Sequence, residues 1–236
     1  MITDSMSIRP TFIEVKMSKV VIFGIQDFAS LAHFYLKEDS PHEVVAFTVT
    51  QEYLPSEETL EGLPVVPFER LENLYPPKEY AFFAPMSHRK MNTLRETIYR
   101  MAENKGYTMI SYISSRATVF SNVKIGKNCF ILENNTIQPF VTIGNNVVLW
   151  SGNHIGHHSV IKDHVLFTSQ VVLSGHCVVE PYCFFGVNAT LRDGLHVAEG
   201  TLIAMGACLT KDTEPWGVYT GLPAKKGPTL SKDLDI

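Results

Sequence analysis

Residues 117–212 divide into consecutive blocks of six: ATVFSN, VKIGKN, CFILEN, NTIQPF, VTIGNN, VVLWSG, NHIGHH, SVIKDH, VLFTSQ, VVLSGH, CVVEPY, CFFGVN, ATLRDG, LHVAEG, TLIAMG and ACLTKD. The third residue of every block, from Val119 to Leu209, is large and apolar, whereas Gly, Asn and Asp gather in the later positions. An amphipathic helix repeats near 3.6 residues and a half-buried strand near 2. A period of six with one deep apolar position is typical of short strands joined by corners, as in a parallel β-helix.

The physical basis of this fold is shared burial. One block cannot bury its apolar residue alone, but stacked coils bury a continuous column of such residues. Tight corners between the strands account for the Gly, Asn and Asp. The alternative is a β-sandwich of short strands, which predicts irregular spacing of about 8–12 residues between turn signals. The unbroken register of the blocks makes the sandwich a poor competitor.

The chain before the repeat alternates strand and helix patterns, which indicates a small parallel α/β domain. Helix signals are Asp27 as an N-cap, a short apolar segment over residues 68–74, and Ser87 as the cap of a helix that closes near Gly106. We expect strands over residues 19–24, 43–49, around Val65, 79–85 and 107–113.

Composition narrows the classes of function. The chain has 236 residues, an ordinary 45% of hydrophobic residues and a net charge of −4, which gives no electrostatic reason to expect nucleic acid. No apolar run is long enough to cross a bilayer and no signal segment opens the sequence, so we expect a cytoplasmic protein. The cysteines form no C-x-x-C pair and are expected to be small buried residues: Cys129, Cys177, Cys183 and Cys208.

The blocks resemble the left-handed β-helix of hexapeptide acyltransferases. Together with the preceding α/β segment, they resemble the amino-sugar acyltransferases that modify nucleotide-linked sugars and the sialic acid O-acetyltransferases. The resemblance implies three blocks per triangular coil, so that residues eighteen apart stack, and a homotrimer with clefts between neighbouring β-helices. It also implies a Rossmann-like acceptor domain over residues 1–110, a β-helix over 111–212 and a capping tail over 213–236.

The resemblance implies acetyl-CoA as acyl donor and no metal. Residues 221–225, Gly-Leu-Pro-Ala-Lys, resemble the G-x-P-A-K closing motif of the family, which lies beside the adenine end of coenzyme A. Lys225 and Lys226 then either meet the 3′-phosphate or form a solvated basic tail. The donor contacts that the resemblance implies are Gly175, Gly186, Val187, Ala204, Met205, Pro223, Ala224 and Lys225.

The turn after the first strand, residues 24–29, keeps only the first glycine of a G-x-G-x-x-G turn, and Asp27 places a negative charge where a phosphate would sit. NAD is therefore disfavoured. Gln26 and Asp27 either bond a base or ribose or merely cap the helix. Arg89 is the better candidate for a phosphate contact, although a solvated helix start is the alternative. The acceptor contacts we expect are Gly24, Gln26, Asp27, His88, Arg89, Asn134 and Asn153.

Residues 155–157, Ile-Gly-His, match the position of the catalytic histidine in similar enzymes. This predicts His157 as the general base that takes a proton from the acceptor as it attacks the thioester, with a solvated corner histidine as the alternative. His158 stands where relatives often carry an acid, and Asp193, two coils on, lies about 10 Å away. Because an amine needs less help from its base than a hydroxyl, we expect an N-acyl product, with Gly175 N–H as an oxyanion donor.

The leading interpretation is acylation of the amino group of a nucleotide-linked amino sugar, in cell-surface polysaccharide or glycan biosynthesis. A sugar O-acetyltransferase of the sialic acid type is the alternative. A zinc hydratase of the carbonic anhydrase kind would need histidines where Ser121 and Lys162 stand. A non-catalytic nucleotide-binding scaffold is disfavoured by the histidine cluster and the closing motif.

Overall fold

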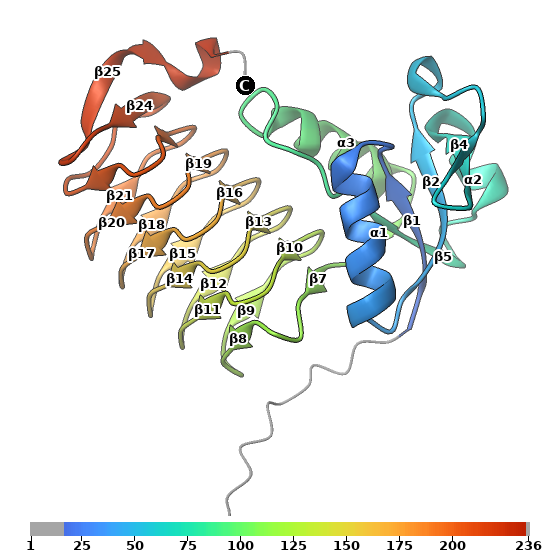
Figure 1. The fold of residues 1–236 in the computed structure, drawn as a ribbon, viewed down its shortest axis with the longest axis horizontal. Helices are drawn as coiled ribbons and strands as arrows, with labels where there is room; N and C mark the ends of the chain where they lie inside the picture. The colour runs from blue at the N-terminus through green and yellow to red at the C-terminus, as the bar shows by residue number, and fades with distance from the viewer. Residues whose placement is uncertain (1–16, 235–236) are drawn as a thin grey trace, which may run out of the picture.

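The computed structural model describes residues 17–234. An α/β domain stands beside a stack of β-helix coils, and α3 (Thr93–Asn104) lies where the two meet (Figure 1). The chain ends in a hairpin at the far end of the stack.

The α/β domain holds a sheet in the order β3-β4-β2-β1-β5-β6. All neighbours pair in parallel except β3 and β4, and Val20, Val21 and Ile22 of the central strand are completely buried. The strand expectations up to residue 85 are confirmed. The strands are β1 (Lys19–Phe23), β2 (Glu43–Val49), β3 (Thr59–Leu60), β4 (Leu63–Pro67), β5 (Tyr80–Phe83) and β6 (Thr108–Met109).

Two helix starts differ from expectation. Asp27 is the first helical residue of α1 rather than its cap, which is Gln26. Asn92, not Ser87, caps α3; it is buried and donates hydrogen bonds from its amide to the carbonyls of Tyr182 and Cys183 in the β-helix. A tertiary contact therefore sets where α3 begins. The helices are α1 (Asp27–Asp39), η1 (Gln51–Tyr53), η2 (Phe68–Arg70), α2 (Leu71–Leu74), α3 and η3 (Ser231–Asp233).

The expected strand over residues 107–113 is wrong as a single strand. Its first half is β6 of the α/β sheet, and its second half is β7 (Tyr112–Ile113), the first strand of the β-helix. Tyr112 N–H donates to the Cys129 carbonyl at 2.8 Å, which joins β7 to the first complete coil. The chain therefore passes from one sheet to the other at Ile110 and Ser111.

The β-helix has three faces of two-residue strands, and each strand pairs in parallel with the strand eighteen residues on, as between Phe130 and Val148. Three blocks therefore make one coil, as expected. The first face contains β7, β10 (Phe130–Ile131), β13 (Val148–Leu149), β16 (Leu166–Phe167), β19 (Phe184–Phe185) and β22 (Leu202–Ile203). The second face contains β8 (Thr118–Val119), β11 (Thr136–Ile137), β14 (His154–Ile155), β17 (Val172–Leu173), β20 (Thr190–Leu191) and β23 (Cys208–Leu209). The third face contains β9 (Lys124–Ile125), β12 (Thr142–Ile143), β15 (Val160–Ile161), β18 (Val178–Val179) and β21 (His196–Val197).

The third residues of the blocks form the core column. From Ile131 to Leu209 each is at most 2% exposed, whereas Val119 and Ile125 at the first coil are only partly buried. Stacked Phe167 and Phe185 rings, 4.0 Å between centroids, fill the middle of the column. The tail closes the other end: β24 (Gly217–Thr220) pairs with β22, β25 (Lys225–Leu230) pairs with β24, and Tyr219 joins the core.

The sixth residue of each block turns the corner. From Asn128 to Gly206 every sixth residue has φ between +54° and +80°, the left-handed region that Gly and Asn adopt most readily. The His158 corner joins the second and third faces and carries Phe140, His158 and His176. The His164 corner joins the third and first faces and carries Asn128, Asn146, His164 and Tyr182. The Gln170 corner joins the first and second faces and carries Asn134, Gly152, Gln170 and Asn188.

The α/β domain packs on the first face. Phe130, Val148 and Leu166 are each 1% exposed and share one apolar cluster with Ala32 and Leu36 of α1. Each of these three face residues occupies the second position of its block, which points outward from the β-helix core. The first face is therefore an interior surface between the two parts of the chain.

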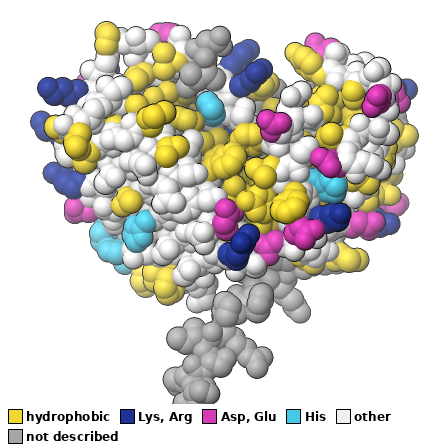
Figure 2. Space-filling view, viewed as in Figure 1, with side chains coloured by type: hydrophobic (Ala, Val, Ile, Leu, Met, Phe, Trp, Pro, Cys, Tyr) yellow, Lys and Arg dark blue, Asp and Glu magenta, His cyan; other side chains and the backbone are white. Residues whose placement is uncertain are grey.

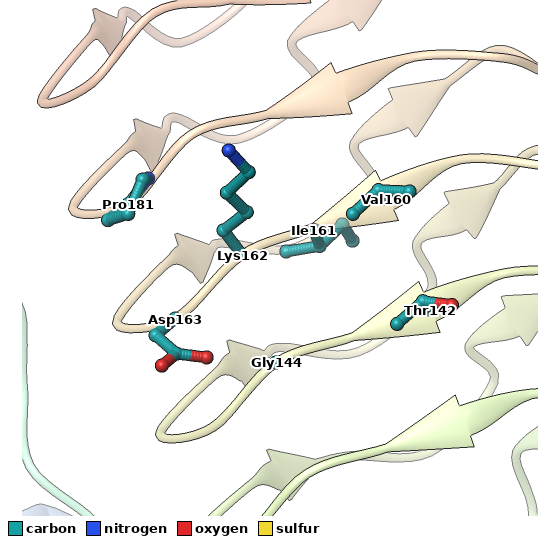
Figure 3. Close-up of a pocket in the computed structure, with 7 residues that line it drawn as sticks. All are labelled: Thr142, Gly144, Val160, Ile161, Lys162, Asp163 and Pro181. Atoms are coloured by element: carbon teal, nitrogen blue, oxygen red, sulfur yellow. The ribbon is translucent and has the colours of Figure 1, made fainter.

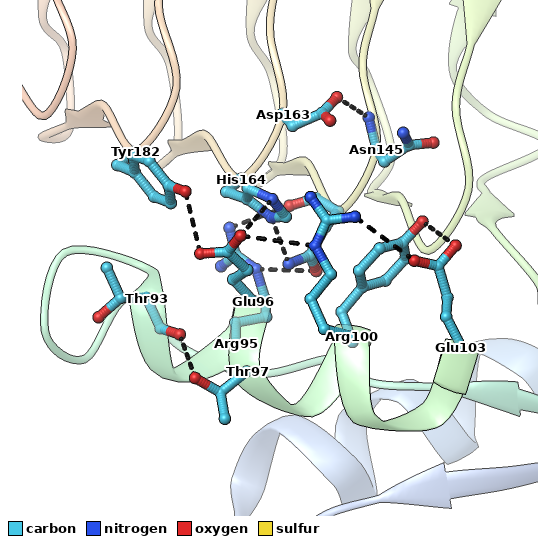
Figure 4. A network of polar contacts seen from close by, with 12 residues as sticks. Thr93, Arg95, Glu96, Thr97, Arg100, Glu103, Asn145, Asp163, His164 and Tyr182 are labelled. Carbon is cyan, nitrogen blue, oxygen red and sulfur yellow. Dashed lines mark hydrogen bonds and ion pairs between the residues drawn. The ribbon is translucent and has the colours of Figure 1, made fainter. Parts of the chain in front are cut away.

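Polar side chains of α3 bind the His164 corner (Figure 4). Glu96 accepts a hydrogen bond from the Tyr182 hydroxyl at 2.9 Å and lies 3.4 Å from Nε2 of His164. Arg95 is completely buried and donates to the side chain and carbonyl of Asn146 and to the carbonyls of Met86 and Val165. Burial lowers the pKa of Arg95 to about 9.

Candidate active site

The His158 corner holds a ladder of rings on successive coils. The His158 ring stacks between Phe140, 4.5 Å away, and His176, 4.9 Å away, with interplanar angles of 28° and 16°. All three residues are exposed and have left-handed backbone, at φ of 66°, 58° and 58° for Phe140, His158 and His176. This backbone is the common corner conformation of the repeat, so the rings and not the φ values distinguish this corner.

His157 is held by three contacts beside this ladder. Its backbone N–H donates to Oε1 of Gln138 at 2.8 Å, and its Nδ1 lies 3.1 Å from Nδ1 of His158. Its ring lies across Gly175, where an added Cβ would come within 2.9–3.2 Å of ring atoms. With the proton on Nδ1 of His157, the bond to His158 leaves Nε2 as a free lone pair, the form that a general base requires.

Gln138 was not among the expected site residues. It precedes His157 by nineteen residues, one more than a full coil. Gln138 occupies the fourth position of its block, where many residue types occur, so its residue type alone does not distinguish it. The stacking of residues eighteen apart predicts this contact, because it places residues 138–140 directly beneath residues 156–158.

The candidate base lies away from the chain's own α/β domain. A triangular coil has three corners, and the corner between the second and third faces is the one that does not border the first face. The polar and ring contacts of His157 run to His158 on the same coil and to Gln138 and His176 on the two neighbouring coils. The expected acceptor residues of the α/β domain are therefore not brought to His157 within one chain.

Those acceptor residues lie at the two segments that flank the first face. Gly24 has φ of +113°, and its N–H donates to the Thr48 carbonyl, while Gln26 and Asp27 are exposed at the start of α1. The His88 ring lies 4.5 Å from the Phe184 ring, and burial, with a smaller contribution from the Arg95 charge, lowers the pKa of His88. Arg89 is exposed. Figure 2 shows hydrophobic side chains gathered where the β-helix meets the α/β domain.

Asn153 is a structural residue and not an available acceptor contact, contrary to expectation. It is 1% exposed; its amide donates to the Trp150 carbonyl, and its Oδ1 accepts from Val171 N–H at 2.8 Å. As the first residue of its block it points into the coil, where a polar side chain must be hydrogen-bonded. Asn134 is exposed on the Gln170 corner.

The expected donor residues divide between two corners. Gly186, Val187, Ala204 and Met205 lie on successive coils next to the Gln170 corner, and Val187 and Met205 are 42% and 77% exposed. A Cβ at Gly186 would collide with the Met205 backbone, so the coils pack closely there. Gly175 lies on the other side of the second face, beside His157. Pro223, Ala224 and Lys225 form the turn into β25, where Ala224 N–H donates to the Cys208 carbonyl at 2.7 Å.

A groove of about 280 Å³ on the third face holds none of the expected site residues (Figure 3). Lys162 extends along it and binds Glu180 at 2.6 Å, while Asp163 accepts a hydrogen bond from Asn145 N–H at 2.7 Å. Its charged groups are therefore already paired. Its lining residues are Thr142, Gly144, Val160, Ile161, Lys162, Asp163 and Pro181.

Three of the four cysteines are buried inside the β-helix. Cys129, Cys177 and Cys183 are buried, as expected, and Cys208 is partly buried. Burial raises the pKa of Cys129 to about 11, so that its thiol stays protonated. Within residues 17–234, the helices are all too short or too polar to cross a bilayer.

Comparison with known proteins agrees with the repeat. Residues 122–157 match the family model "Bacterial transferase hexapeptide (six repeats)". A perosamine N-acetyltransferase variant from Caulobacter crescentus, in complex with CoA and GDP-perosamine, superposes with a TM-score of 0.80 at 20% identity, over 90% of this chain and 98% of that one. The acetyltransferase domain of PglB from Neisseria gonorrhoeae gives 0.78 at 19% identity, over 88% and 98%. WeeI from Acinetobacter baumannii AYE gives 0.74 at 20% identity, over 89% and 100%.

These superpositions cover both parts of the chain, so the whole arrangement of α/β domain and β-helix is shared. The expected resemblance to hexapeptide-repeat proteins of this kind is confirmed. At about 20% identity the similarity establishes the fold, and the chemistry has to be argued from the site.

Proposed function

We propose that the protein transfers an acyl group from acetyl-CoA to the amino group of a nucleotide-linked amino sugar, with His157 as general base. The observation that carries this proposal is the placement of the His157 imidazole, which is exposed yet held by Gln138, His158 and Gly175. The fold supports it, because the similar perosamine N-acetyltransferase was solved with CoA and GDP-perosamine.

In the proposed reaction the acceptor nitrogen attacks the thioester carbonyl carbon. A C–N bond forms, the C–S bond breaks, and coenzyme A leaves as a thiolate that takes up the proton from His157 to become the thiol. His157 Nε2 takes the proton that the nitrogen loses, so no covalent enzyme intermediate is required. Gly175, on the coil after His157 and against its ring, is our candidate for the N–H that meets the developing oxyanion.

The pair of histidines favours an amine over a hydroxyl acceptor. The His158 imidazole orients His157 but supplies no negative charge to stabilise the imidazolium, as the carboxylate of a Ser-His-Asp triad does. A hydroxyl needs that help because its proton must leave as attack occurs. A neutral amine is already nucleophilic and only gives up its proton afterwards, which an unassisted imidazole can accept.

The complete site is proposed to form between subunits of a homotrimer of left-handed β-helices. His157 lies on the corner away from its own α/β domain, and Gly175 lies across the second face from Gly186 and Met205. A neighbouring subunit would bring its α/β domain to His157 and its Gly186 and Met205 to Gly175. Exposed apolar side chains lie on or beside the second face: Val172, Val187 and Met205 are 38%, 42% and 77% exposed.

The two ligands are proposed to use different parts of the chain. Coenzyme A would be held by the close-packed backbone at Gly186, Val187, Ala204 and Met205 and by the segment Pro223, Ala224 and Lys225. The Rossmann-like α/β domain would hold the nucleotide, with Gln26 or Asp27 at the base or ribose and Arg89 at a phosphate. His88, stacked on Phe184, would shape the pocket. A role in cytoplasmic synthesis of a surface polysaccharide or glycan follows from such an acceptor.

The test is release of the coenzyme A thiol from acetyl-CoA across a panel of nucleotide-linked amino sugars. Wild-type protein is expected to turn over at least one of them, and His157→Ala to lose about 10²–10⁴-fold in turnover while retaining coenzyme A affinity. Light scattering on the same samples should give the mass of a trimer. Turnover by His157→Ala at the wild-type rate would refute the assignment of the base.

A further inference from the structure

The His158 corner contains a third imidazole that the proposed acyl transfer does not use. We propose that His157, His158 and His176 form a binding site for a borderline transition-metal cation of the Zn²⁺ class, and that the bound cation blocks His157. Each histidine offers a ring nitrogen, and these nitrogens all lie within 4.8 Å of one another. Figure 2 shows histidine side chains gathered at the outer edge of the β-helix.

The spacing suits a tetrahedral ion. Zn–N bonds of 2.0–2.1 Å place two ligand nitrogens about 3.3 Å apart. The Nδ1 atoms of His157 and His158 are already 3.1 Å apart. The His157 ring is nearly perpendicular to both others, at 88° and 87°, and its centroid lies 5.2 Å and 4.9 Å from theirs. Small side-chain rotations therefore bring the third nitrogen to bonding distance.

The three rings can make this adjustment by exchanging their present ring contacts for bonds to the ion. All are exposed, and exposed side chains change rotamer within nanoseconds. Neutral imidazole is the form that binds metals. His164 provides a contrast on the neighbouring corner, because it is buried and its nitrogens already meet Asn146 and Glu96. Three histidine ligands leave a fourth position open, as in many zinc sites.

Metal binding and acyl transfer would compete for His157. When Nδ1 of His157 coordinates the cation, the proton of the neutral ring sits on Nε2, which then has no lone pair for the acceptor proton. Coordination also replaces the Nδ1 contact with His158. This consequence rests on the proposed function, whereas the binding site itself does not. Free zinc is therefore expected to inhibit the enzyme reversibly.

Binding is tested on the full chain after EDTA treatment and buffer exchange, by titrating Zn²⁺ in competition with a chromophoric chelator. We expect a saturable site that His176→Gln weakens at least about tenfold. The matched control is His196→Gln, which removes another exposed histidine, one that lies 3.1 Å from Glu180 outside the cluster. The control should bind as wild type does. Absence of binding, or equal affinities for the two variants, would overturn the site.

Inhibition gives the second readout. Zinc should abolish turnover at the concentrations that fill the site, EDTA should restore it, and His176→Gln should shift inhibition to higher zinc. Binding without inhibition would contradict both the blocking of His157 and its role as base. Failure of the site to bind zinc, with turnover intact, would overturn this inference and leave the proposed function standing.

Discussion

Nδ1 of His157 and Nδ1 of His158 face each other across 3.1 Å, so one imidazole donates a hydrogen bond to the other. The pair fixes the orientation of His157 without adding a formal charge. The stacked rings of Phe140 and His176 in turn hold His158 in place. The properties of the proposed base therefore depend on a neutral neighbour, which substitution can change.

Two replacements of His158 separate its effect on the orientation of His157 from the effect of a charge at position 158. His158→Asp and His158→Asn are matched in size, and both residue types tolerate the left-handed backbone at φ 58°. The carboxylate should favour the imidazolium form of His157, so the acid limb of the kcat/KM profile should move to higher pH in the Asp variant relative to the Asn variant. Identical pH profiles for the two would show that residue 158 does not act on the base.

Gly175→Ala tests the support beneath the base. The added Cβ would approach the His157 ring to 2.9–3.2 Å and displace it, although the backbone of Gly175 is not left-handed and accepts alanine. We expect kcat to fall about a hundredfold, as small misplacements of catalytic groups do, with little change in melting temperature. Ser174→Ala, one residue earlier, is the control and should retain turnover. Wild-type kinetics for Gly175→Ala would place the reacting group elsewhere.

Arg95→Ala tests the junction between the two parts of the chain. The substitution removes the Arg95 donor from the buried Asn146 carbonyl and the partly buried Met86 carbonyl, and leaves Val165 with only its backbone donor, Val148 N–H. Together with the loss of a completely buried side chain, this should lower the free energy of unfolding by about 3 kcal/mol. Arg100→Ala on the same helix removes a side chain that is 56% exposed, and should cost less than about 1 kcal/mol. Urea denaturation measures both, and equal losses would contradict the role given to Arg95.

The buried His164 predicts a pH dependence of stability. Burial lowers its pKa from 6.5 and outweighs the attraction of Glu96 and Asp163. Below about pH 6.5 the unfolded chain then binds a proton that the folded chain does not, so the free energy of unfolding should fall as the pH drops through this range. His164→Asn should make the fall between pH 7 and pH 5 shallower. An unchanged slope would show that His164 titrates alike in both states.

The repeat made most of the fold predictable. An apolar residue at the third position of a block, such as Ile155 or Leu173, predicts that its side chain is buried. The stacking of residues eighteen apart follows from three blocks of six residues in each coil. The same regularity places Gly175 next to His157, eighteen residues on, whereas the choice of His157 as base came from the resemblance of residues 155–157 to the family. Local sequence is sufficient where a structure is periodic because each coil repeats the environment of the last.

Contacts between the two parts of the chain were not predictable. Asn92 takes φ of 67° at the start of α3 because its amide binds carbonyls of the β-helix, and no local signal marks that partner. The split of residues 107–113 has the same origin, since Tyr112 pairs with a strand that lies later in the chain. An arginine within a helix, such as Arg95, is ordinarily expected on the exposed surface, whereas in the structure Arg95 is completely buried.

The most direct test of the proposed chemistry is mass spectrometry of products from paired acceptors, one nucleotide-linked amino sugar and its hydroxyl analogue, each incubated with acetyl-CoA. The neutral His157–His158 pair predicts acylation of the amino sugar at nitrogen, with little or no product from the hydroxyl analogue and loss of the product in His157→Ala. Preferred acylation of the hydroxyl analogue would contradict the central claim.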